Sequence, residues 1–84
     1  MSDREERARV RAKIGGLILT FYRAHIGMAF HAEDLRRYVL ALAPEIAPDS
    51  PGRILRMLRQ EGQLDYVVID RRDSLYLFKA RVPA

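Results

Sequence analysis

Arginines recur at every third position between residues 53 and 59, a spacing that aligns side chains along one face of a helix. The residues are Arg53, Arg56 and Arg59, followed by Gln60. An exposed row of this kind adds affinity for a polyanion, because each guanidinium that neutralises a phosphate releases counterions. Arginine also offers a fork that fits guanine O6 and N7, and glutamine fits adenine. We expect nucleic-acid contacts here, strongest at Arg53 and Arg56, because a helix in a groove reads bases mainly through its N-terminal turns.

Three more residues near this row could contact phosphate. Ser50 precedes Pro51, and this pair predicts an N-cap serine followed by a proline at the first helical position. The Ser50 hydroxyl and the free amides of that first turn could hold a phosphate. Arg71 and Arg72 stand between two aspartates in a polar break, and these carboxylates partly cancel their charge. A solvated cationic face with Glu61 and Asp65 as partners is the alternative interpretation.

The elements that position these residues follow from patterning. Apolar residues between 54 and 58 lie on one side of a helical wheel, and Gly62 allows a left-handed end to that helix. Residues 64–69 and 75–78 are β-branched, aromatic runs around the polar break, which predicts a β-hairpin with the two arginines at its tip. The apolar side of the helix comprises Ile54, Leu55, Met57 and Leu58, and the first strand is expected to alternate Leu64, Tyr66 and Val68 with Asp65, Val67 and Ile69.

Two helices are predicted before this region. The first covers residues 9 to about 25, with residues 1–8 as a frayed extension, and its paired glycines at 15 and 16 suggest close approach of another helix. Residues 28–30 form a candidate short strand. The second helix ends before Pro44, and Ile46 is the apolar anchor of the connection that follows. The expected apolar stripes are Val10, Ile14, Leu17, Ile18, Phe21 and Tyr22 in the first helix, and Leu35, Tyr38, Val39 and Leu42 in the second.

Length and composition set the class of protein. The chain has 84 residues, of which 49% are hydrophobic and 31% charged, with a net charge of +4. These values predict one globular domain over residues 9–80 with a loose tail at 81–84, and the positive charge suits a polyanionic partner. The absence of cysteine, of a secretory signal and of a long apolar run predicts a cytoplasmic protein without membrane contact.

Catalysis finds little support in the residue types. The chain has two histidines, no cysteine and no serine within a nucleophile motif, so we expect no enzymatic activity and no cofactor or small-molecule ligand. A metal site built from His25, His31 and Glu33 is disfavoured, because nothing in the spacing makes these side chains converge. The tyrosines and phenylalanines could stack on single-stranded bases, but their periodic positions favour core packing.

Three segments together resemble the winged helix-turn-helix superfamily over roughly residues 9 to 79. They are FHAEDLRRYV, SPGRILRMLRQEG and LDYVVIDRRDSLYLF. The resemblance implies an α+β fold of three helices with a C-terminal hairpin, the wing. It implies that the third helix enters the major groove of double-stranded DNA and that the wing lies on the backbone or in the minor groove. The contacts it implies are Ser50, Arg53, Arg56, Arg59 and Gln60 in the helix, and Arg71 and Arg72 in the wing.

The resemblance suggests a small transcriptional regulator or accessory DNA-binding protein that forms a homodimer through its first helix. Winged helices also serve as protein-interaction modules. Here the first helix and the apolar surface, including Leu19 and the paired glycines, would then form the interface. Both interpretations stay open from the sequence.

Overall fold

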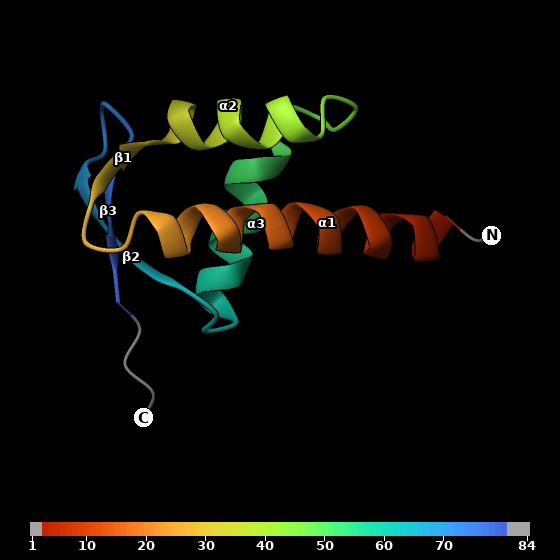
Figure 1. Cartoon of the computed structure of the whole chain (residues 1–84), viewed down its shortest axis with the longest axis horizontal. Helices are drawn as coiled ribbons and strands as arrows, with labels where there is room; N and C mark the ends of the chain where they lie inside the picture. The colour runs from red at the N-terminus through yellow and green to blue at the C-terminus, as the bar shows by residue number, and fades with distance from the viewer. Residues whose placement is uncertain (1–2, 81–84) are drawn as a thin grey trace.

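The computed structural model describes residues 3–80 and has an α+β fold of three helices and three strands (Figure 1). The predicted class, the helix count and the short strand before the second helix are confirmed. The helix expected from residue 9 already begins at Asp3, whereas the tail predicted at 81–84 lies outside the described residues. The elements are α1 (Asp3–Ala24), β1 (Ala29–His31), α2 (Ala32–Leu42), α3 (Ser50–Gln60), β2 (Asp65–Asp70) and β3 (Leu75–Lys79).

The three strands form one antiparallel sheet in the order β1-β3-β2. The predicted hairpin is therefore confirmed as β2 and β3, and β1 pairs with its inner strand, setting Phe30 opposite Tyr76. Gly62 ends α3 with a φ of 78°, the left-handed conformation expected of it, and Gln63 donates its N–H to the Leu58 carbonyl at 2.9 Å. This turn directs the chain from α3 straight into β2.

The helices pack on one another beside the sheet. α1 and α2 lie side by side, α3 crosses both, and the sheet stands at the end where α1 leads into β1 (Figure 1). Aromatic rings fill the junction: Phe78 is fully buried and its ring stacks on Phe30 with centroids 3.9 Å apart. The core predicted from the aromatic pattern is thus confirmed for Phe21, Tyr22, Phe30, Tyr66 and Phe78.

Two residues of the predicted apolar stripes and one of the predicted strand are exposed. Val10 is 40% exposed because α1, with 22 residues, is twice as long as α3 and its first turns extend beyond the crossing. Leu42 is 53% exposed at the last residue of α2. Val68 is 41% exposed on β2, which lies at one edge of the sheet.

Helix packing does not account for the glycine pair in α1 as predicted. Gly15 is buried and lies beside α3, and a Cβ there would meet Leu58 Cδ2 at 3.8 Å. That distance is an ordinary van der Waals contact, and a Cβ on Gly16 meets nothing within 4 Å. Helix packing therefore does not require glycine at either position.

Among residues 3–80, no helix is both long and apolar enough to cross a membrane.

Candidate nucleic-acid interface

α3 is fixed by its apolar side. Ile54, Leu55 and Leu58 are each less than 10% exposed and pack into the core shared with α1 and α2. Burial of this side forces the opposite side of α3 toward solvent, since the helix repeats every 3.6 residues. The arginines predicted to be outward are therefore held at the surface by the core beneath them.

Ser50 does not take the predicted role. The N-cap is Asp49, no side-chain hydrogen bond caps the helix, and Ser50 already belongs to the first turn. Ser50 is only 6% exposed, and its Oγ lies 3.5 Å from Nη2 of Arg53. The N-cap prediction is wrong, because the helix begins one residue earlier than the Ser-Pro pair suggested. Burial also makes the Ser50 hydroxyl a poor phosphate ligand.

Arg53 and Arg56 are exposed on α3 and carry uncompensated charge. Nε of Arg56 donates to the Gly52 carbonyl at 3.3 Å, one turn back along the same helix. Within residues 3–80 neither arginine has an acidic partner within 4 Å. Both guanidinium groups are therefore available to an anion outside the chain.

Arg59 differs from these two arginines because it has partners within the chain. Its Nε lies 3.7 Å from Oδ1 of Asp65, and its guanidinium carbon lies 4.6 Å from the centre of the Tyr66 ring. Pairing with Asp65 was the alternative interpretation of this arginine, and it is confirmed. Gln60 is exposed in the last turn of α3.

The hairpin tip presents Arg71 and Arg72 on a constrained turn. Oδ1 of Asp70 accepts hydrogen bonds from the backbone N–H groups of Arg72 at 2.9 Å and of Asp73 at 3.2 Å. The Asp70 carboxylate thus stabilises the turn, an arrangement typical of aspartate in turns. It has no ion pair with Arg71 or Arg72 among residues 3–80. The Ser74 carbonyl also accepts from the Ala32 N–H at 3.0 Å, so the tip is attached to the start of α2.

The arginines of α2 form a contrasting pair. Arg36 and Arg37 both form ion pairs with Glu33, one turn earlier on the same helix, and the Arg37 Nε lies 3.4 Å from Oε1 of Glu33. The hydrogen bond from Arg36, supported by the charge of both arginines, lowers the pKa of the Glu33 carboxyl below its ordinary value of 4.5. The Glu33 carboxylate therefore neutralises part of the charge of these two arginines.

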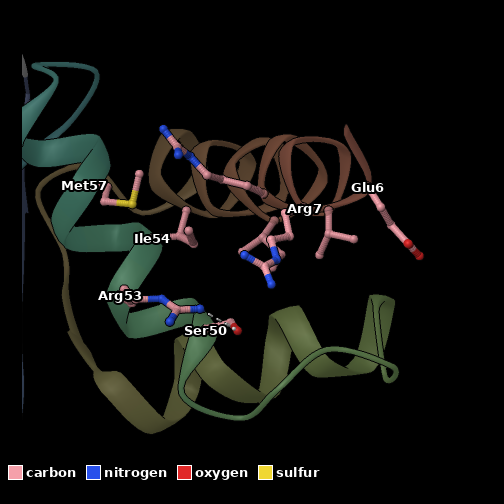
Figure 2. A pocket seen from close by; sticks show the side chains of 9 residues that line it. Glu6, Arg7, Ser50, Arg53, Ile54 and Met57 are labelled. Carbon is pink, nitrogen blue, oxygen red and sulfur yellow. Dashed lines mark hydrogen bonds between the residues drawn. The ribbon is translucent and has the colours of Figure 1, made fainter. Parts of the chain in front are cut away.

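Two arginines of α1 join the surface beside α3, and the sequence did not single them out. Arg7 and Arg11 line a groove of about 580 Å³ between the N-terminal half of α1 and the first turns of α3 (Figure 2). Figure 2 shows Arg7 and Arg53 reaching into the same space from opposite helices. We call this the α1–α3 groove. Its apolar floor is Val10, Ile14, Ile54 and Met57, and its cationic rim is Arg7, Arg11 and Arg53.

The spacing of four residues between Arg7 and Arg11 was the available signal, because it places both on one face of a helix. What the sequence did not indicate is that α3 crosses α1 at that face.

The histidines have structural neighbours. The His25 ring stacks on Phe21 with centroids 4.1 Å apart, and Nδ1 of His31 lies 3.2 Å from the Asp73 carbonyl. No group of three or more potential metal ligands converges among the residues that the structure describes.

Comparison of the chain with protein-family models, curated proteins and solved structures found no significant match in any of the three.

Proposed function

We propose that this chain is a winged-helix protein that binds double-stranded DNA through α3 and the β2–β3 hairpin. The observation that carries the proposal is the pair Arg53 and Arg56, exposed on a well-anchored helix and without an acidic partner in residues 3–80. The element order α1-β1-α2-α3-β2-β3 supports it, because it places a hairpin directly after the helix that carries these arginines.

In the proposed complex α3 enters the major groove. An α-helix fits this groove, where arginine can bind guanine O6 and N7 or neutralise flanking phosphates. Arg53 and Arg56 are the main contacts, Gln60 is secondary, and Arg59 contributes less because Asp65 and Tyr66 hold it. Arg71 and Arg72 contact the backbone or the minor groove from the hairpin tip.

The test removes the two α3 arginines and compares them with the two α2 arginines. We expect Arg53→Ala plus Arg56→Ala to weaken duplex binding by ~2–4 kcal/mol, and to reduce the slope of log affinity against log salt by up to ~2. Arg36→Ala plus Arg37→Ala removes the same charge, and we expect it to cost less than ~0.5 kcal/mol, as for an ordinary surface change.

Binding is measured by fluorescence anisotropy on duplexes selected from a random pool, over a salt titration, with circular dichroism to verify that each variant folds. Unchanged duplex affinity in the α3 variant, or an equal loss in both variants, would contradict the assignment of α3.

We also propose that the protein acts in the cytoplasm as a small transcriptional regulator or accessory DNA-binding protein and forms a homodimer through α1. Two copies would give the longer, symmetric site that small DNA-binding domains commonly need. The oligomeric state follows from light scattering over a range of protein concentrations.

A protein-interaction module is the second candidate, and the apolar floor of the α1–α3 groove favours it. Such a module would co-purify with a protein partner yet fail to shift duplex DNA at ~0.1 M salt, where phosphate contacts still contribute strongly.

A further inference from the structure

We propose that the α1–α3 groove binds an acidic amphipathic helix of a partner protein. This inference rests on the second candidate function, the protein-interaction module, and specifies its partner; the groove shares Arg53 with the proposed DNA contact. The groove lies between two helices, and its volume of about 580 Å³ is within the range of concave binding sites. Its floor is apolar and its rim is cationic.

The apolar floor is the first argument. Val10 is 40% exposed and Met57 is half-buried, although other apolar residues of both helices lie in the core. The two residues come from different helices and line one groove together with Ile14 and Ile54. Apolar side chains on one face of a helix can fill such a groove at spacings of three and four residues.

The cationic rim is the second argument, and it selects the charge of the partner. Arg7 and Arg53 have no ion-pair partner within residues 3–80, and Arg11 has only Glu61, at 3.6 Å. Glu6 is the one acidic residue among those that line the groove. Carboxylates flanking the apolar face of a bound helix would therefore meet unpaired guanidinium groups, and charge complementarity of this kind sets partner choice.

Two other occupants fit this groove less well. Residues 3–13 of α1 contain five cations and three acids, so the same residues of a second copy seated in this groove would bring arginine against arginine, whereas the proposed homodimer would use α1 around Leu19. A DNA backbone would satisfy the rim but leave the apolar floor uncovered, because phosphates offer nothing to Val10 or Met57. An acidic helix with one apolar face satisfies both parts of the groove.

The test uses two fluorescein-labelled peptides of about 18 residues, a length that supports a helix. One places leucines at helical spacing among glutamates, and the other has the same composition in scrambled order, so that only the apolar face differs. Fluorescence anisotropy with the full chain at ~0.15 M salt, where surface charges are screened beyond about 8 Å, gives the two affinities. We expect the amphipathic peptide to bind at least ~10-fold more tightly.

Three variants locate the binding site. Val10→Gln changes the floor, Arg7→Glu reverses one rim charge, and Arg23→Glu makes the same charge change on an exposed residue in the last turn of α1. We expect each groove variant to weaken the amphipathic peptide ~10-fold, while Arg23→Glu leaves its affinity unchanged.

Equal affinity for the two peptides, or an equal loss in Arg23→Glu, would overturn the proposal. So would a result in which Arg7→Glu weakens duplex DNA but neither groove variant affects the peptide, because the groove would then be part of a DNA surface.

Discussion

α2 and α3 are helices of the same length, eleven residues each, and α2 exposes two arginines while α3 exposes three, yet their charges have different surroundings. Arg36 and Arg37 share the carboxylate of Glu33 on their own helix. Arg53 and Arg56 have no acidic partner within residues 3–80. An arginine row thus indicates a polyanion surface only where the chain does not neutralise it, and sequence spacing alone does not distinguish the two helices.

The hairpin tip extends this comparison to a third pair, Arg71 and Arg72. We expect Arg71→Ala plus Arg72→Ala to lower duplex affinity by ~1–2 kcal/mol and the salt slope by up to ~2, with little change in sequence preference, because backbone contacts do not read bases. Binding is compared across a panel of related duplexes at several salt concentrations. A changed preference among those duplexes would instead mean that the tip contacts base edges.

The difference in charge pairing between α2 and α3 can be reduced by placing an acidic residue on α3 one turn before Arg56. Gly52 is exposed, a Cβ there meets nothing within 4 Å, and it stands four residues before Arg56, as Glu33 does before Arg37. We expect Gly52→Glu to weaken duplex binding by ~1 kcal/mol, the upper range for an exposed ion pair. It should also raise the free energy of unfolding by ~0.5–1 kcal/mol, because glycine is a poor helix former.

Gly52→Gln is the matched control. We expect chemical denaturation to show the gain that comes from replacing glycine, without the further contribution of an ion pair to Arg56, and we expect no loss of duplex affinity, since only the charge differs between the two variants. An equal loss of affinity with Gly52→Gln would mean that side-chain volume at this position, and not pairing of Arg56, weakens the contact.

Substitution of Asp70 tests whether a carboxylate that stands next to an arginine in the sequence also neutralises that arginine. Its two hydrogen bonds to backbone N–H groups make it part of the turn, so we expect Asp70→Ala to lower the free energy of unfolding by ~0.5–1.5 kcal/mol. Asparagine keeps an acceptor oxygen, so we expect Asp70→Asn to retain most of the stability while binding duplex DNA slightly more tightly. Equal destabilisation by both substitutions, measured by urea unfolding, would show that the charge itself stabilises the turn.

Much of the fold is local in origin, which is why the sequence predicted it. Gly62 after an amphipathic run and the polar break between two β-branched runs specify the helix, its end and the hairpin without distant contacts.

The features that the sequence did not predict depend on how elements far apart in the chain pack against one another. The exposure of Val10, the meeting of Arg7 with Arg53, and the turn of Arg59 onto Tyr66 all join elements far apart in the chain. Helical periodicity defines which residues share a face but not which element packs against that face. The exposure of the arginine row was therefore predicted correctly, whereas the separate surroundings of its members were not.

Acidification tests the pairing on α2 directly and is expected to give the smallest effect. The pKa of Glu33 is lower in the folded protein than its ordinary value of 4.5 in an unfolded chain, so ionised Glu33 stabilises the fold above pH 4.5. That contribution disappears as the pH falls through the lowered pKa. Glu33→Gln should therefore be less stable than the parent at neutral pH, and the difference should shrink toward pH 3 in thermal melts at ~0.01 M salt, where screening is weakest.

In the Arg36→Ala plus Arg37→Ala background the same substitution should no longer change the pH dependence, because the partners that lower the pKa are gone. Persistence of the effect there would show that something other than the two arginines stabilises the Glu33 carboxylate. The pH dependence would then no longer support the contrast between α2 and α3, which would rest on the ion-pair distances from Arg36 and Arg37 to Glu33 alone.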